Sequence, residues 1–206
     1  MKGAQCERDY GVKMEGKLRV SILILIFILI SHLSGWEARK LLWAEENSED
    51  WAIVETEFFT VFYPKELNIK KINRKINTRF IDVDLAGSVP PKRVPEKLLA
   101  YKFDLIFRKA ETLLDMYPRG IHVNVKIYKT PEQLDRVSSG ITGRVNRVGS
   151  FYIHKQKTIY TTVKAISEAV LCHEIAHSII DHYFVIFPPR KIQELLATYV
   201  ETHLED

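Results

Sequence analysis

Residues 163–180 read VKAISEAVLCHEIAHSII, a run of mostly small and apolar residues that predicts a buried helix. Within it lie His173, Glu174 and His177. Histidines four residues apart project from one face of a helix, so both imidazoles can reach a single metal ion. Glu174 follows His173 directly, where its carboxylate can reach a water molecule beside that ion. This His-Glu-x-x-His spacing predicts a metal site in which the glutamate acts as a base.

The residues that flank the motif are uncharged, as expected for a helix buried beneath an active site. Two histidines and a glutamate in such a helix would be costly without a role, because these groups need partners once water is removed. A catalytic zinc site also needs a third protein ligand and an open position for water. Asp181 shares the face of the histidines, but it lies another turn along and is not expected to reach the same ion.

Two carboxylates in a second predicted helix compete for the place of the third ligand. Pro188-Pro189 breaks the chain, and a helix over residues 192–201 follows. Glu194 lies in its first turn, where an antiparallel return brings it over the metal. Glu201 shares the same face but lies about 10 Å further along the axis, so both cannot bind one ion. If Glu194 binds, Glu194→Ala should weaken zinc affinity by orders of magnitude, and Glu201→Ala should change it little.

The remaining sequence predicts alternating strands and helices, and therefore an α+β fold. A helix is indicated by Leu99, Phe103, Ile106, Ala110, Leu113 and Tyr117, which recur at spacings of three and four residues. Thr130-Pro131-Glu132-Gln133 predicts the start of another helix with a capping box. The other expected elements are strands over residues 56–63 and 121–128, a loop over residues 65–97 with a short strand at 80–83, and a hairpin over 151–161.

The two zinc-site segments resemble the gluzincin metallopeptidases, specifically the compact peptidase-MA-like group. VLCHEIAHSII matches the His-Glu-x-x-His helix, and QELLATYVE matches the downstream glutamate helix. Upstream, FFTVFYP, VKIYKTPEQL and GSFY are similar to the family's opening strand, central strand with its turn, and edge hairpin, so the resemblance covers about residues 51–204. The family has a glycine where this chain has Leu195. A metzincin arrangement is excluded, because its third histidine would fall at Tyr183.

The resemblance implies a zincin-like α+β fold, in which a small mixed or antiparallel sheet packs on the active-site helix and the glutamate helix. It favours Glu194 as the third ligand beside His173 and His177, with Zn²⁺ as the cofactor. Glu174 would then be the general base of a peptidase. The polypeptide substrate would lie along an edge strand near residues 151–154.

A transition-state donor in such enzymes is usually a tyrosine or a histidine. Tyr183, Tyr199 and His182 are available, and the residues alone do not choose among them. Two alternatives to a peptidase also stay open. One is a catalytically silent interaction module tethered to the membrane, which the small size and Leu195 would suit. The other is metal-dependent hydrolysis of a substrate that is not a peptide. The intact Glu174 favours an enzyme.

Residues 1–44 predict a signal peptide or a signal anchor with a short linker. The segment 20–33 reads VSILILIFILISHL, and Lys13, Lys17 and Arg19 precede it. A basic region before a short apolar run is typical of export signals, whereas a membrane span needs about 20 apolar residues. We therefore expect an extracytoplasmic protein, periplasmic or secreted, or one that is anchored in the membrane by this segment. Residues 45–206 would form the metallopeptidase domain.

The charge of residues 45–206 is nearly balanced. Residues 1–44 hold 7 of the 30 Lys and Arg and 4 of the 26 Asp and Glu, which leaves 23 basic and 22 acidic residues. Nucleic acid is therefore not an expected partner. The chain has two cysteines, Cys6 and Cys172, so a disulfide scaffold is excluded. The sequence specifies no oligomeric state.

Overall fold

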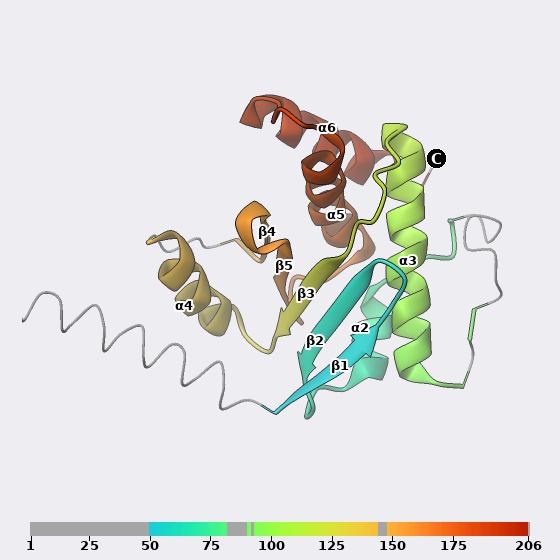
Figure 1. The fold of residues 1–206 in the computed structure, drawn as a ribbon. Coiled ribbons are helices and arrows are strands. Elements are labelled where there is room, and N and C mark those ends of the chain that lie inside the picture. Colours follow the sequence, from blue (N-terminus) through green and yellow to red (C-terminus); the bar gives the residue numbers. More distant parts are fainter. Residues whose placement is uncertain (1–49, 82–89, 92, 144–147, 206) are drawn as a thin grey trace, which may run out of the picture. The chain divides into compact units, whose positions relative to one another are not determined.

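A computed structural model describes residues 50–81, 90–91, 93–143 and 148–205 (Figure 1). Five strands form one sheet in the order β1-β2-β3-β5-β4. They are β1 (Trp51–Glu55), β2 (Phe59–Pro64), β3 (Val123–Tyr128), β4 (Ser150–Ile153) and β5 (Thr158–Thr162). The central strands β2, β3 and β5 are parallel, and β1 and β4 pair antiparallel with β2 and β5. The sheet is therefore mixed, and β4 is an edge strand among the described residues.

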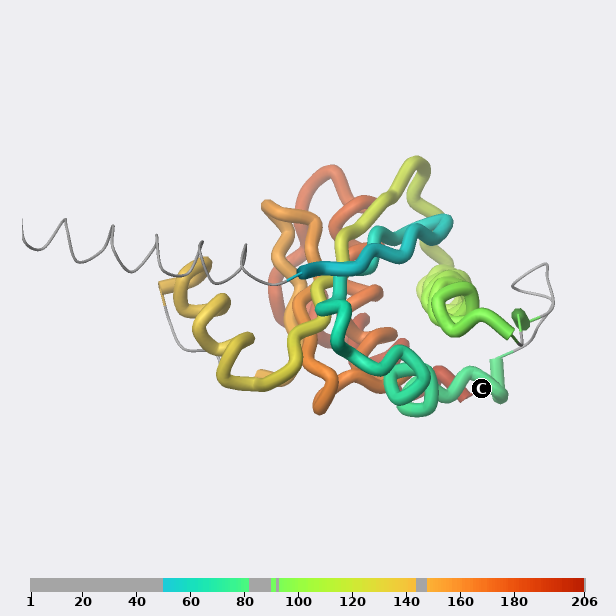
Figure 2. Tube along the Cα trace, turned by 90° about the horizontal axis from the view of Figure 1, so that it is seen from below, coloured from blue at the N-terminus to red at the C-terminus, as the bar shows by residue number. Residues whose placement is uncertain are grey.

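The described residues also form five α-helices, which pack on the sheet or on one another. They are α2 (Ile69–Lys75), α3 (Pro95–Leu114), α4 (Pro131–Thr142), α5 (Glu168–Tyr183) and α6 (Arg190–Thr202). Helices α2, α3 and α5 share the larger core with the sheet, and α6 packs on α5 and α3. Figure 2 shows α4 and α3 at opposite sides of the strands. Mixed helix and strand content agrees with the predicted α+β class.

Side-chain alternation along the strands builds two cores of unequal size. On β3, Val125 and Ile127 face the larger core, which is shared with α2, α3, α5 and α6. Tyr128 faces the opposite way, into a smaller cluster beneath α4 that also contains Phe151 and Tyr160. Because Phe151 belongs to β4, packing under α4 holds the edge strand in place.

Helix α5 begins five residues later than the sequence predicts. The stretch before it forms a turn, in which Thr162 accepts hydrogen bonds from the backbone N–H groups of Ala165 and Ile166. Ser167 is the N-cap, and its side chain accepts from the Val170 N–H. The predicted helix over residues 163–180 is thus corrected to Glu168–Tyr183, because the turn takes the backbone groups that the first helical turn would need.

Three other local predictions are corrected by the structure. The strand expected over residues 56–63 starts at Phe59, because Thr56 and Phe59 close a turn that follows β1. The loop expected over residues 65–97 contains α2, which Asn68 caps with its side chain. Phe80 and Ile81 lie in a turn rather than a strand, and the remainder of that predicted strand lies outside the described residues.

The other predicted elements are confirmed. Helix α3 starts at Pro95, and a backbone in the left-handed conformation at Asp115 ends it, so Tyr117 lies beyond the helix and is 57% exposed. Thr130 caps α4 with both hydrogen bonds of the capping box. The β4–β5 hairpin lies where the sequence places it. Strand β3 starts at Val123 rather than at residue 121, and α6 spans Arg190–Thr202 rather than residues 192–201.

The predicted export segment, residues 1–44, lies outside the described residues. Signal peptide and signal anchor therefore both stay predictions. Within the part of the chain that the structure describes, no helix combines the length and apolar character that crossing a membrane requires.

Candidate metal centre

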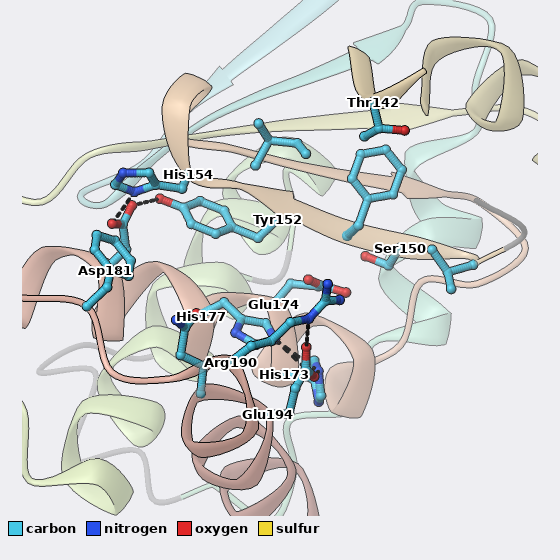
Figure 3. Close-up of a pocket in the computed structure, with 15 residues that line it drawn as sticks. Thr142, Ser150, Tyr152, His154, His173, Glu174, His177, Asp181, Arg190 and Glu194 are labelled. Carbon is cyan, nitrogen blue, oxygen red and sulfur yellow. Dashed lines mark hydrogen bonds and ion pairs between the residues drawn. The ribbon is translucent and has the colours of Figure 1, made fainter. Parts of the chain in front are cut away.

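Helices α5 and α6 bring three side chains to one point. His173 and His177 project from the same face of α5, with their Nε2 atoms 3.3 Å apart. Glu194 reaches over from α6, and its Oε2 atom lies 3.6 Å from each of these nitrogens (Figure 3). Helix α6 begins at Arg190, so Glu194 lies just past its first turn rather than within it. These are the three residues that the sequence and the resemblance propose as metal ligands.

The spacing of the three atoms fits a zinc ion. Zinc binds imidazole nitrogen and carboxylate oxygen at about 2.0–2.2 Å in a tetrahedron, so two of its ligand atoms lie about 3.3–3.6 Å apart. The observed separations of 3.3, 3.6 and 3.6 Å are close to that edge length. Two imidazoles and one carboxylate also suit zinc better than magnesium or calcium, which prefer oxygen ligands alone.

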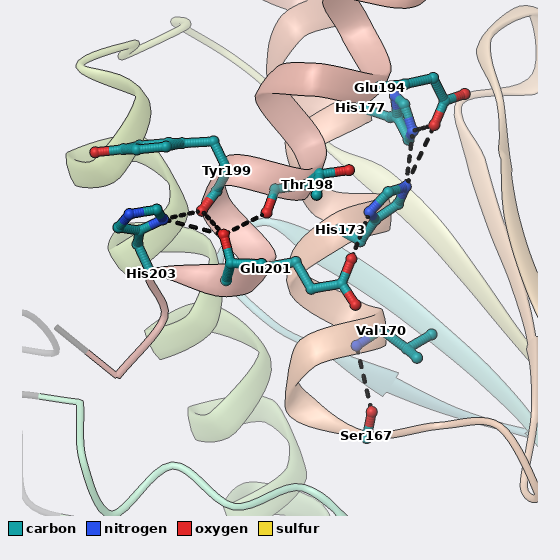
Figure 4. A network of polar contacts seen from close by, with 10 residues as sticks. Ser167, Val170, His173, His177, Glu194, Thr198, Tyr199, Glu201 and His203 are labelled. Carbon is teal, nitrogen blue, oxygen red and sulfur yellow. Dashed lines mark hydrogen bonds and ion pairs between the residues drawn. The ribbon is translucent and has the colours of Figure 1, made fainter.

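Glu201 contacts the opposite side of the His173 ring. Its Oε2 atom lies 2.9 Å from His173 Nδ1 (Figure 4). An ionised carboxylate only accepts hydrogen bonds, so Nδ1 donates and the Nε2 lone pair is left facing His177 and Glu194. The two competing glutamates therefore take different places, Glu194 within the triad and Glu201 behind one of its histidines.

Glu174, the predicted base, lies in the same pocket and is 7% exposed. Burial is the main cause that raises the pKa of its carboxyl, to about 8, and the nearby Glu194 adds to this. Hydrogen bonds with the Ser150 side chain and the Tyr152 backbone act in the opposite direction. These two partners belong to β4, so the edge strand holds the carboxylate beside the triad.

The surroundings of His177 favour its neutral form. Burial, and then the neighbouring His173, lower the pKa of His177, which favours the neutral ring that a metal ligand requires. Arg190 Nε lies 3.3 Å from Glu194 Oε1, the carboxylate oxygen that faces away from the histidines. Helix α6 thus supplies both the carboxylate of the triad, on Glu194, and a guanidinium group, on Arg190, that contacts this carboxylate.

The site opens into a pocket of about 520 Å³ between α5, the start of α6 and the edge strand β4. Its polar floor is the triad and Glu174. Val148, Phe151 and Phe187 contribute an apolar side. The pocket thus places the edge strand β4 and an apolar wall next to the four polar groups.

A second polar cluster lines the pocket, and the sequence did not predict it. Asp181 is almost wholly buried and accepts a hydrogen bond of 2.6 Å from the Tyr152 hydroxyl. His154, just after β4, pairs with the same carboxylate through Nδ1. Burial and the bond to Asp181 raise the pKa of Tyr152. Two features of the sequence could have indicated this cluster. Asp181 lies on the ligand face of α5, and Tyr152 lies on the same face of its strand as Ser150.

The three predicted transition-state donors do not line this pocket. Tyr199 stacks on His203 with ring centroids 4.2 Å apart, and Tyr183 packs edge-on against Phe184. His182 bonds through Nδ1 to the Ser178 carbonyl. Each of these side chains is engaged away from the triad, so the structure does not bring the predicted donors to the site.

Leu195 does not crowd the site, although the family resemblance has glycine there. Its side chain is 63% exposed on α6. Cys172, next to His173, is buried, and burial raises the pKa of its thiol to about 12, so it is not a reactive nucleophile. The assignment of the site rests on its donor atoms and their spacing. Comparisons with models of protein families, with curated proteins and with solved structures find no match to this chain.

Proposed function

We propose that this protein is a zinc-dependent peptidase with a zincin-like fold of the gluzincin type. The observation that carries the proposal is the meeting of three donor atoms, on His173, His177 and Glu194, at separations of 3.3 to 3.6 Å. The buried carboxylate of Glu174 and the edge strand β4 border the same pocket. This combination supplies metal ligands, a base and a docking edge for an extended chain.

His173, His177 and Glu194 would hold the metal, and Glu201 would fix the His173 ring. When bound there, zinc would supply a Lewis acid that polarises a carbonyl and increases the acidity of water. Glu174 accepts a proton from the attacking water as the new C–O bond forms. It then passes that proton to the amine nitrogen as the peptide C–N bond breaks. Water is consumed, and a carboxyl and an amine are released.

The edge strand favours a polypeptide as the substrate. β4 pairs only with β5 among the described strands, and all four of its residues line the pocket. An extended peptide can add there through main-chain hydrogen bonds. The apolar wall, which includes Val148 and Phe187, suits an apolar substrate side chain.

The test combines metal analysis with a peptide-hydrolysis assay on the full chain. Wild type should contain one zinc per chain and cleave peptides. Glu174→Gln should retain zinc and lose cleavage, because a base is removed and no ligand is. His173→Ala should lose both. Glu205→Gln, which alters an exposed carboxylate at the end of the chain, is the matched control and should behave as wild type.

Each other outcome points to a different function. Zinc in both wild type and Glu174→Gln without cleavage of a peptide library would favour a silent interaction module or a substrate other than a peptide. Iron in place of zinc would contradict the hydrolase, since two histidines and one carboxylate also suit iron-dependent oxygenases. Loss of metal in Glu174→Gln, as complete as in His173→Ala, would contradict the role of the base.

A further inference from the structure

The segment between α5 and α6 carries the most exposed large apolar side chains of the described residues. Residues 183–189 read YFVIFPP and contain no charge. Val185 is 100% exposed, Ile186 84% and Phe187 41%. We call these three residues the apolar tip. None of the three belongs to either core, and protruding apolar side chains such as Val185 and Ile186 can mark an interaction site.

The apolar tip is too small for a stable protein interface. Full burial of three such side chains removes roughly 200–300 Å² from water. A specific protein–protein interface buries about 800 Å² on each partner. A protruding tip would also need a matching pocket on another protein. A lipid bilayer has no such requirement, because its acyl region accepts any apolar protrusion.

Basic residues lie near the apolar tip. Arg190, with its side chain 89% exposed, and Lys191 follow it after Pro188-Pro189. The His154 ring packs edge-on against Phe187 with centroids 4.4 Å apart, which brings the β4–β5 turn beside the tip. That turn carries Lys155 and Lys157, both exposed.

Two acids near the tip pair with basic groups: the buried Asp181 side chain with His154, and Glu194 with Arg190. The lysines near the tip are not neutralised in this way. Lys155, Lys157 and Lys191 form no ion pair with any described residue. Basic residues around an apolar protrusion complement anionic lipid headgroups. Tyr183, 48% exposed at the base of the segment, is of the aromatic type that favours the membrane–water interface.

We propose that the apolar tip inserts into the surface of an anionic phospholipid bilayer, with the exposed side chains of Lys155, Lys157 and Lys191 at the headgroups. A short apolar insertion binds weakly and reversibly, so stable attachment needs a second element. The predicted anchor, residues 20–33, can supply it.

This contact does not depend on peptidase activity, but it affects where the pocket would work. Phe187 of the apolar tip and Arg190 beside it both line the pocket. With the tip in the bilayer, the pocket mouth lies at the membrane surface. Taken with the proposed function, the substrate class is polypeptide held close to a membrane, such as the segment next to a membrane span.

Site-specific fluorescence on the full chain tests the insertion. In a Cys6→Ser background, Ile186→Cys places one accessible thiol at the tip, because Cys172 is buried. Ile53→Cys, on the 56% exposed Ile53 of β1, is the matched control. Each variant is labelled with an environment-sensitive fluorophore and placed in nanodiscs of phosphatidylcholine with phosphatidylglycerol. Nitroxide lipids then report contact with the bilayer.

The label at position 186 should gain emission several-fold and be quenched by shallow nitroxides, while the label at position 53 should not. Lys191→Glu, or nanodiscs of phosphatidylcholine alone, should weaken the quenching. Equal behaviour of both labels would overturn the proposal. Emission at position 186 that rises with protein concentration and is not quenched by nitroxide lipids would also overturn the proposal. In that case a second copy of the chain, and not the bilayer, would cover the tip.

Discussion

His173 is the residue on which the candidate metal centre depends most, because both of its ring nitrogens are engaged. Nε2 faces His177 and Glu194, and Nδ1 contacts Glu201. A carboxylate on the far nitrogen fixes the orientation of a ligand ring and makes it a better donor. Among the described contacts, the His177 ring has no carboxylate on its far nitrogen. The two histidines should therefore respond differently when their neighbours change.

Glu194→Ala should weaken zinc affinity by orders of magnitude, because it removes one of three donor atoms. Glu201→Ala should weaken it by about tenfold, since the contact of 2.9 Å orients His173 without binding the metal. The loss of zinc affinity that we expect from the structure for Glu201→Ala is therefore larger than the small change that the sequence predicts. Competition with a zinc chelator measures the zinc dissociation constant of each variant. A larger loss in Glu201→Ala than in Glu194→Ala would exchange the roles of the two residues.

The edge strand β4 is joined to α5 by hydrogen bonds to two acidic side chains of that helix. Ser150 hydrogen-bonds to Glu174, and Tyr152 donates to Asp181. These contacts join the strand that would bind substrate to the helix that carries the ligands. The width of the pocket is therefore set by pairing between side chains of two elements, and not by the strand alone.

Tyr152→Phe should lower the free energy of unfolding by about 1–2 kcal/mol, because it leaves a buried carboxylate oxygen of Asp181 without its donor. Tyr117→Phe, which changes a tyrosine that is 57% exposed, should alter stability by less than about 0.5 kcal/mol. Urea unfolding of the full chain measures both. Equal, small effects would mean that the Tyr152–Asp181 contact does not hold β4 in place.

Elements with strong local signals could be predicted from the sequence. The stripe of α3 and the capping box of α4 depend on residues within each helix, as does the spacing of His173 and His177 on α5. Helix α2 was missed because its seven residues sit among basic side chains, although Ile69 and Ile72 are buried at helical spacing. The Tyr152–Asp181 contact joins residues 29 positions apart. Such a contact follows from the sheet order, which no local pattern encodes.

At the scale of the whole molecule, Glu111 links folding to pH. It lies on α3 and is 8% exposed. Burial is the main cause that raises the pKa of its carboxyl from 4.5 to about 7, and nearby Arg108 opposes this. An acid whose pKa is higher in the folded state binds its proton more tightly there. Its contribution to stability is therefore fully present below about pH 4.5 and is lost as pH rises to about 7.

Glu111→Gln should raise the free energy of unfolding by about 1–3 kcal/mol at pH 8 and change it little at pH 4, because the amide carries no charge to bury. Glu96→Gln is the control, since Glu96 is an exposed acid in the first turn of the same helix. Removing the Glu96 charge should lower the free energy of unfolding by less than about 1 kcal/mol. Urea unfolding of both variants at pH 4 and pH 8 measures these free-energy differences. A gain at pH 8 no larger than at pH 4 would contradict the burial of a charged Glu111.

The largest-scale prediction combines the pocket with the apolar tip. A peptide attached by its lipid to the same nanodisc as the full chain should be cleaved faster than the free peptide, because the tip holds the pocket mouth at the bilayer and raises the effective concentration of substrate there. The double variant Val185→Ser, Ile186→Ser should reduce this preference several-fold. It should cleave the free peptide as wild type does, since neither side chain lines the pocket and both are exposed. Rates for the two peptides, measured side by side, give the preference. An unchanged preference in the double variant would show that residues 20–33 alone bring the pocket to membrane-bound substrates.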